Sequence, residues 1–468
     1  MTHVHLVGIG GSGLSAIALV LLESGYTVSG SDQQLSPLAR RVQAAGARVE
    51  AGHRAENIRG ADLLVRSSAI GDDNVEVQAA RAAGIPVYKR ADYLGQLMHG
   101  RQAIAVAGTH GKTTTTAMLA WMLAALGTDP SYIIGGVSAN LGANAHAGRG
   151  PFFVIEADEY DHMFLGLQPH LAVVTNVEYD HPDCYPTPQE FHQAFLDFAG
   201  RLQPGGVLVG CTDDPGAARL LAETARQGLP TVAYGLAERR GRAQPDYLAA
   251  HPRPNQAGGF SFELVRRSEQ GSAQPPLAVA LRVPGLHNVC NALAALAVAD
   301  RLGLPLEQAG RALAAFAGTG RRFAILGEAR GITIIDDYAH HPTEIRATLA
   351  AARARYPGRR IWAVWQPHTY SRTRTLFDAW LAAFQDAERV LVTEIYPARE
   401  AAPADGFSAR QVVDALWHAE ARFVPGLDEA RAILLAELAE GDVVLVLSAG
   451  DAERLSAQVL QALQAPPG

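Results

Sequence analysis

The sequence predicts an α/β protein of three domains, each containing a mainly parallel sheet covered by helices. Its 468 residues suggest three domains at roughly 150 residues per domain. Short apolar runs alternate with helical patterns along the chain, which is typical of parallel sheets. Two glycine-rich turns each follow an apolar run and precede a helical pattern, as in nucleotide-binding α/β folds.

The N-terminal third predicts a Rossmann-like domain. An apolar strand pattern comes first, followed by the turn GIGGSG and a helical pattern that runs to about residue 24. Strands are predicted at residues 4–7, 27–30, 63–65 and 86–88. The turn indicates a diphosphate site for NAD, FAD or another nucleotide, and a merely tight turn is the weaker alternative.

Several polar residues of this domain are candidates for binding the same ligand. An acid follows the second strand at the distance expected for a ribose contact, and two serines follow a later strand. The serines are equally consistent with ordinary surface positions. The candidate residues are Gly8, Gly10, Gly11, Ser12, Gly13, Asp32, Ser67 and Ser68.

The central part begins with a strand, a tight turn and a helix, predicted at residues 103–107, 108–111 and 112–126. Lys112 directly follows the turn and is one of only two lysines in the chain, the other being Lys89. We interpret this segment as a variant P-loop that binds ATP, with Val106 where a glycine is usual. Thr113 is placed to ligate Mg²⁺. The expected ATP-binding residues here are Gly108, Thr109, His110, Gly111, Lys112, Thr113 and Thr114.

Two acidic segments follow the next predicted strands of this domain. The strands are predicted at 152–155 and 171–174, with a further one at 206–209, and the acids lie at 156–161 and 175–181. Carboxyl ends of parallel strands meet at one edge of a sheet, so both segments are expected beside the P-loop. Mg²⁺ prefers oxygen ligands, which makes Glu156 a candidate.

The last part predicts a third α/β domain. Residues 237–276 are expected to be an exposed loop leading into antiparallel strands, and 318–320 a hinge. Strands are predicted at 332–335, 361–364, 390–392 and 443–447. We therefore expect a Rossmann-like domain at 1–102, a P-loop ATPase-type domain at 103–318 and a second Rossmann-like domain at 319–468.

Cationic and imidazole side chains follow the strands of the third domain. The segments are 321–322, 336–341 and 366–374, and their arginines suit carboxylate or phosphate. His340 and His341 are as consistent with structural roles as with catalysis. Asn288 and Asn291 open a long Ala/Leu-rich helix and are expected either to read a purine edge or to cap that helix.

The amino-acid composition limits which binding partners and which cellular location are expected for this protein. Lys and Arg total 40 against 47 Asp and Glu, a net charge of −7, which disfavours nucleic acid as the main partner. No apolar run of membrane-spanning length and no secretion-signal pattern occur, so no membrane association and a cytoplasmic location are expected. Three widely spaced cysteines fit a reducing compartment.

Taken in order, the motifs resemble the Mur ligase family over essentially the whole chain. They are GIGGSG at 8, SSAI at 67, GTHGKTTTT at 108, EADE at 156, TNVEYDH at 175, HNVCNA at 287, GRRF at 320, DDYAHHPTE at 336, QPHTYSRT at 366, EIYPARE at 394 and SAGD at 448. The resemblance implies a three-domain ligase of peptidoglycan synthesis that uses ATP and Mg²⁺. It points to the branch that joins L-alanine to the lactyl carboxylate of UDP-N-acetylmuramate through an acyl phosphate.

The resemblance also implies roles for individual residues. The first domain would hold the UDP-sugar, the middle domain ATP and Mg²⁺, and the last would close over both. Lys112 would stabilise the transferring phosphoryl group, Asn288 or Asn291 would read adenine, and Arg322 would contact phosphates. Thr113, Glu156 and His181 would be metal positions. Asp337, His341 and Arg372 would face the site from the closing domain.

Three departures from the family pattern and two other functions remain open. EADEYD stands where a serine is often found, Thr369 where an arginine is common, and SAGD replaces GAGD. Residues 180–201 contain no lysine, so the carbamylated lysine of related ligases is absent, as the alanine-adding branch implies. The alternatives are a recycling ligase that attaches a tripeptide to the same UDP-sugar and a nicotinamide-dependent oxidoreductase. A non-catalytic nucleotide-binding protein is a third class.

Overall fold

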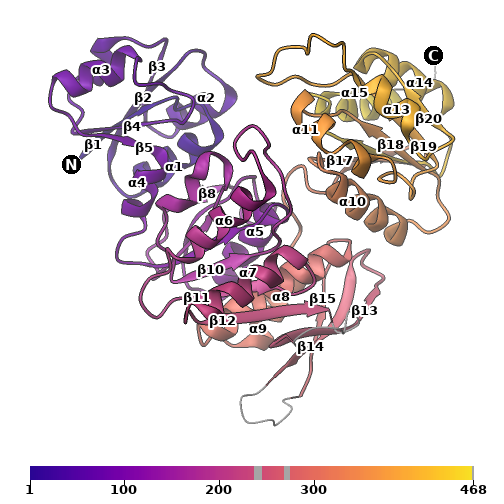
Figure 1. Cartoon of the computed structure of the whole chain (residues 1–468), viewed down its shortest axis with the longest axis horizontal. Coiled ribbons are helices and arrows are strands. Elements are labelled where there is room, and N and C mark those ends of the chain that lie inside the picture. Colours follow the sequence, from indigo (N-terminus) through magenta and orange to yellow (C-terminus); the bar gives the residue numbers. More distant parts are fainter. Residues whose placement is uncertain (237–244, 268–274, 466–468) are drawn as a thin grey trace.

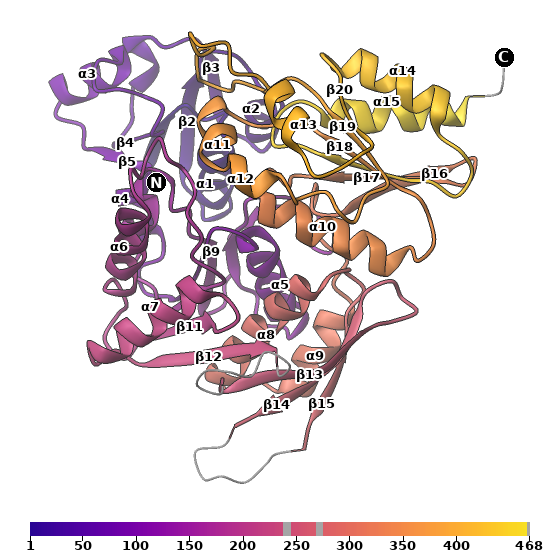
Figure 2. The same cartoon turned by 45° about the vertical axis from the view of Figure 1, so that its right-hand side comes forward.

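The computed structural model describes residues 1–236, 245–267 and 275–465, and it contains three sheets. Figures 1 and 2 show the first and third sheets, with their helices, standing side by side above the larger central one. The three-domain α/β class predicted from the sequence is confirmed. Among the described residues no helix combines the length and apolarity needed to cross a bilayer.

The N-terminal sheet is wholly parallel, in the order β3-β2-β1-β4-β5. The chain turns sharply from β1 into α1 at GIGGSG, where Gly8 has a φ of +86°. Its elements are β1 His3–Val7, α1 Ser12–Glu23, β2 Thr27–Asp32, α2 Pro37–Ala44, β3 Arg48–Ala51, β4 Leu63–Arg66, α3 Val75–Ala82, β5 Val87–Lys89 and α4 Arg90–Leu97.

The central sheet has the order β15-β14-β13-β12-β11-β10-β6-β9-β7-β8 and is parallel through its middle. Helices cover both faces, so its inner strands are continuous apolar runs. Its strands are β6 Gln102–Ala107, β7 Ser131–Ile133, β8 Ala145–His146, β9 Phe152–Glu156, β10 Leu171–Val174, β11 Val207–Cys211, β12 Thr231–Leu236, β13 Tyr247–Pro254, β14 Phe260–Arg266 and β15 Leu277–Ala280. Its helices are α5 Lys112–Ala125, α6 Pro188–Ala199, α7 Pro215–Arg226, α8 Leu286–Arg301 and α9 Leu306–Ala314.

One expectation for this domain was partly wrong. Residues 247–254, predicted as exposed loop, form β13, which pairs with β12 in parallel and with β14 antiparallel. Tyr247 is buried at 6 % exposure, so this segment extends the sheet and its core. Residues 237–244 and 268–274 of the expected loop lie outside the described residues.

The third sheet has the order β16-β17-β21-β18-β19-β20, and only the β16–β17 pair is antiparallel. Helices pack on both of its faces. Its strands are β16 Ala324–Ala329, β17 Ile332–Asp337, β18 Ile361–Trp365, β19 Arg389–Val392, β20 Ala421–Phe423 and β21 Val443–Leu447. Its helices are α10 Pro342–Arg355, α11 Tyr370–Thr375, α12 Phe377–Trp380, α13 Ala409–Ala415, α14 Leu427–Glu437 and α15 Glu453–Gln464.

Aromatic packing on one face of this sheet yields a stability prediction. Trp365 is fully buried, with its ring centroid 4.3 Å from that of Trp380 and 5.3 Å from that of Phe384. Trp365→Ala should lower the free energy of unfolding by about 3–5 kcal/mol, because it removes buried area and leaves a cavity. Trp417, which is 68 % exposed, is the matched control, and Trp417→Ala should change that free energy by less than about 0.5 kcal/mol. Denaturant unfolding followed by circular dichroism measures both, and equal losses would contradict the packing described.

Candidate functional site

The central sheet brings the P-loop and both acidic segments to one edge. Strand β6, which leads into the loop, lies between β9 and β10 and is parallel to both. The carboxyl ends of all three strands therefore meet, as the sequence predicts. The segments that follow β9 and β10 supply most of the polar contacts of the loop.

The turn itself is shaped by glycines and by the segment after β10. Gly108 has a φ of +133°, and a Cβ atom there would collide with the Thr175 hydroxyl. The backbone N–H of His110 donates to Asn176 Oδ1 at 2.8 Å. Helix α5 begins after Gly111, and no side chain caps its first N–H groups. Uncapped N–H groups at a helix N-terminus are an anion-binding arrangement.

Lys112 folds back over this turn. Its Nζ donates to the carbonyl oxygens of Gly108 and Thr109 at 2.6 and 3.1 Å, and to Glu159 Oε1 at 2.9 Å. Burial is the largest single influence and would lower the pKa of Lys112, but the nearby acids Glu159, Asp158 and Glu156 together outweigh burial and the pKa is raised. The ammonium is therefore charged, and it is held in place by oxygen atoms of its own loop.

A second polar pair lies at the start of α5. The Thr113 hydroxyl donates to Glu156 Oε1 at 3.0 Å, while Gly135 N donates to Glu156 Oε2 at 2.7 Å. Burial raises the pKa of Glu156, and Lys112 opposes that rise. His181 Nε2 lies 3.6 Å from Glu159 Oε1. Carboxylate, hydroxyl and imidazole groups thus surround the lysine.

The third domain docks on this site through a buried ion pair. Arg372 Nε donates to Asp180 Oδ1 at 2.8 Å, and its Nη2 lies 3.3 Å from Oδ2. Both residues are buried. Burial would raise the pKa of Asp180, but Arg372 holds it far below its usual range. Since a buried charge left without its partner costs several kcal/mol, this pair fixes how the two domains meet.

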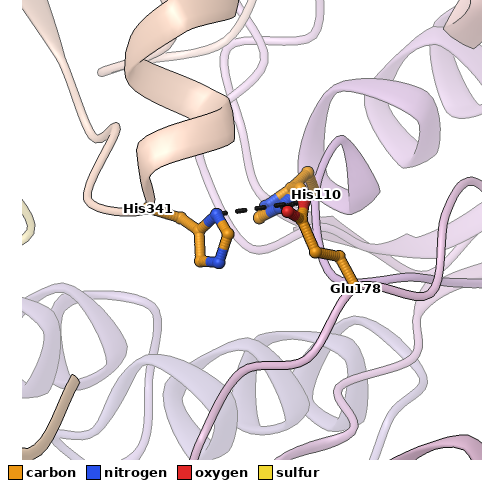
Figure 3. Close-up of side chains that lie close together, drawn as sticks. All are labelled: His110, Glu178 and His341. Atoms are coloured by element: carbon orange, nitrogen blue, oxygen red, sulfur yellow. Dashed lines mark hydrogen bonds and ion pairs between the residues drawn. The ribbon is translucent and has the colours of Figure 1, made fainter. Parts of the chain in front are cut away.

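A second set of contacts joins the same two domains around His110 (Figure 3). His110 Nε2 lies 3.0 Å from Glu178 Oε2, and its Nδ1 lies 3.3 Å from Glu344 Oε1 of α10. The rings of His110 and His341 are 4.6 Å apart between centroids. Thr343 donates to Glu178 Oε1 at 2.7 Å. His341 accepts from Thr343 N and so caps α10.

These contacts move the two histidine pKa values in opposite directions. Burial lowers the pKa of a histidine, but hydrogen bonds to Glu178 and Glu344 raise that of His110 to about 9. For His341 burial prevails, with the His110 charge adding to it, and the pKa falls to about 4. At neutral pH His110 is therefore the charged member and His341 the neutral one.

The other residues predicted in these domains lie around the same edge. Arg322 Nη1 is 3.6 Å from Glu344 Oε1, and its guanidinium lies over the Tyr338 ring. Asp337 is buried, accepts from the N–H groups of Phe323 and Ala339, and burial raises its pKa to about 6.

The two asparagines lie behind the P-loop. A Cβ atom at Gly111 would lie 2.9 Å from Asn291 Oδ1, so this amide reaches the turn. Asn291 Nδ2 donates to Asn288 Oδ1 at 3.0 Å, and Asn288 Nδ2 donates to the Pro284 carbonyl at 2.7 Å. Two buried amides are thus fixed relative to the turn.

The residues predicted in the N-terminal domain form a separate group around GIGGSG. Asp32 Oδ2 accepts from Gly10 N at 2.9 Å, so this acid holds the turn itself. Ser67 packs against Gly8, whereas Ser12 and Ser68 are exposed. The Arg90 guanidinium lies against Gly13, in the space that a Cβ atom at this position would occupy.

Sequence reasoning assigned no role to several residues that build the site. Glu159, Asp180 and Glu178 lie within the two predicted acidic segments, but nothing in the sequence distinguishes them from their neighbours. The sequence does contain a pattern that indicates a role for Glu344, because His341 and Glu344 have the three-residue spacing of a capping box. Arg90 lies two residues after the strand predicted at 86–88, near the strand end where ligand-facing residues gather.

The pKa of His110 predicts how the docking depends on pH. The pKa of His110 is raised from 6.5 to about 9 in the folded protein. Its charge therefore stabilises the folded protein fully below pH 6.5, and this stabilisation is lost as the pH rises through about 9. At its largest it is on the order of 3 kcal/mol. Melting temperatures of the protein and of a His110→Gln variant should differ most below pH 6.5 and converge above pH 9. A difference that stays constant or grows with pH would contradict this arrangement.

Comparison with known proteins identifies the family. The model of the Mur ligase family catalytic domain matches residues 3–102, the Mur ligase middle domain matches 106–299, and the Mur ligase glutamate ligase domain matches 321–450. UDP-N-acetylmuramate–L-alanine ligases of Roseiflexus sp. (strain RS-1) and Bordetella petrii are each 46 % identical, over 99 % and 97 % of both chains. The crystal structure of the UDP-N-acetylmuramate–alanine ligase of Thermotoga maritima is 30 % identical, with a TM-score of 0.79 over 99 % of both chains. The chain therefore belongs to the Mur ligase family.

Proposed function

We propose that this chain is an ATP-dependent ligase that joins L-alanine to the lactyl carboxylate of UDP-N-acetylmuramate. One observation carries the proposal: a charged lysine stands on a glycine turn at an uncapped helix N-terminus, and another domain is docked over that turn. The names and coverage of the relatives at 43–46 % identity support L-alanine as the amino acid.

The turn fits a triphosphate. The first N–H groups of α5 are uncapped, and the Lys112 ammonium is bonded to backbone carbonyl oxygens that phosphate oxygens would replace. The proposed ATP-binding residues are Gly108, Thr109, His110, Gly111, Lys112, Thr113, Thr114, Asn288, Asn291 and Arg322. The fixed amides of Asn288 and Asn291 suit the edge of a purine.

The acids beside the turn fit Mg²⁺. Thr113, Glu156 and His181 are the proposed metal residues, and the Thr113 hydroxyl already lies 3.0 Å from a Glu156 oxygen. When bound, Mg²⁺ would neutralise part of the phosphate charge.

In the proposed reaction the lactyl carboxylate attacks the γ-phosphorus, and ADP leaves. The amine of L-alanine then attacks the acyl phosphate carbonyl, the C–N bond forms, phosphate leaves, and the nitrogen gives up a proton. Lys112 stabilises the charge that develops on the transferred phosphoryl group. The third domain, which Arg372 holds in its docked position and which contributes Asp337 and His341 to the site, excludes water from the labile anhydride.

The N-terminal turn fits the diphosphate of the UDP-sugar. The proposed contacts are Gly8, Gly10, Gly11, Ser12, Gly13, Asp32, Ser67 and Ser68, with the Arg90 guanidinium against the same turn. The proposed domains span residues 1–102, 103–318 and 319–468. A cytoplasmic location follows from the proposed substrates, which are soluble nucleotides and an amino acid.

The two lysines of the chain allow a matched test of the turn. Lys112→Ala should lower kcat at least about 100-fold, because it removes a cation that meets the phosphoryl group. Lys89→Ala removes the other, exposed lysine and should leave kcat within twofold. Phosphate release under saturating substrates measures both, with circular dichroism to confirm folding. Near-normal turnover of a folded Lys112→Ala protein would overturn the role of this residue.

A substrate panel tests the proposed activity as a whole. Phosphate release should require ATP, UDP-N-acetylmuramate and L-alanine together, and should stop when any one is omitted. Release with a tripeptide in place of L-alanine, and not with L-alanine, would instead identify a recycling ligase. A fluorescence change of NADPH on mixing, without ATP turnover, would favour an oxidoreductase.

A further inference from the structure

A cluster of two thiols and a carboxylate lies where β11, β12 and α8 meet. Cys211 is the last residue of β11, Asp213 follows two residues later, and Cys290 is in the first turns of α8. One ligand atom from each of the three lies within 4.8 Å of the other two. The Cys290 Sγ is 3.8 Å from Asp213 Oδ2.

The cluster is held by rigid elements. Strand β11 pairs with β10 and β12 in the middle of the central sheet, and Cys211 is 4 % exposed. Asp213 Oδ2 accepts from Leu236 N at 2.8 Å, which ties the carboxylate to the end of β12. Burial raises the pKa of Tyr234, and the charge of the Asp213 carboxylate adds to that rise. These ligand positions are therefore set by the sheet and α8.

The donor set selects a class of metal. Two sulfur ligands favour soft or borderline divalent cations such as Zn²⁺ over Mg²⁺ and Ca²⁺, which take oxygen ligands. Ligands about 2.0–2.3 Å from a tetrahedral zinc lie roughly 3.3–3.8 Å from one another. The ligand atoms here lie within 4.8 Å of one another, and Cys290 Sγ and Asp213 Oδ2 are 3.8 Å apart, which is close to that geometry.

We propose that Cys211, Asp213 and Cys290 form a binding site for a thiophilic divalent cation of the zinc type. Binding converts two thiols to thiolates and releases two protons, so that the ion is held by two sulfurs and one carboxylate oxygen. A fourth position is left for water. This site shares no ligand with the proposed Mg²⁺ residues, and it does not depend on the proposed ligase activity.

The probe is Cd²⁺, which gives a thiolate-to-metal charge-transfer band in the near ultraviolet. The full-length protein, freed of metal and kept reduced by a phosphine without ATP, is titrated with CdCl₂. We expect the band to saturate at one Cd²⁺ per chain, and added Zn²⁺ to reverse it. Removing a group that only hydrogen-bonds to a metal ligand lowers metal affinity about 10–100-fold. Cys290→Ala removes a ligand itself, so it should weaken Cd²⁺ binding by more than about 100-fold. Cys184→Ala, which removes the third cysteine, should bind as the wild type does.

Alanine is a good helix residue, so Cys290→Ala is expected to fold. Asp213→Asn, which keeps the shape and can still accept from Leu236 N, provides a second variant and should also weaken Cd²⁺ binding. Any of three results would overturn the proposal: no band in the wild type at equimolar Cd²⁺, an unchanged band and affinity in Cys290→Ala, or loss of the band in Cys184→Ala. A Cys211–Cys290 disulfide that persists under the phosphine would overturn it as well.

Discussion

The site depends on one partly buried positive charge. Lys112 is the first residue of α5, and no side chain caps the first N–H groups of this helix. Oxygen atoms must therefore balance the charge of its ammonium group. In this structure those are the carbonyl oxygens of Gly108 and Thr109 and the carboxylate of Glu159. Much of the local architecture satisfies this constraint: the left-handed glycines bend the turn, and β9 and β10 flank β6 so that their acids reach it.

The same need for balanced charge joins the domains. The acids that follow β10 meet cations on both sides, Asp180 from Arg372 and Glu178 from His110. Glu344 completes the second contact from α10, so His110 lies between carboxylates of two domains. Domain docking thus depends on the buried Asp180–Arg372 pair and on the partly buried charges around His110, and separation of the domains would leave Asp180 and Arg372 unpaired.

The sequence predicted the parts of the fold that have strong local patterns. The limits of β10 and β21 were given correctly, since fully buried strands are uninterrupted apolar runs. The short or edge strands β3, β7, β8 and β20 were not predicted, because their few residues carry no clear alternation and their pairing comes from tertiary contacts. Strand β13 was mistaken for loop because its second half is polar and proline-rich.

For the site, the sequence predicted which segments meet but not which side chains pair. The turn and both acidic segments were expected at one edge, and they meet there. Asp180 and Arg372 are 192 residues apart in sequence, and they pair only because two domains dock. The pairing of His110 with both Glu178 and Glu344 is likewise a property of the assembled domains. Such contacts leave no trace in local spacing or periodicity.

A crystal structure with a non-hydrolysable ATP analogue and Mg²⁺ tests the role of the turn most directly. We expect the γ-phosphate against the backbone N–H groups at the start of α5. The Lys112 ammonium should leave the carbonyl oxygens of Gly108 and Thr109 for the phosphate oxygens. Nucleotide bound elsewhere, with Lys112 still bonded to those carbonyl oxygens, would contradict the role assigned to this turn.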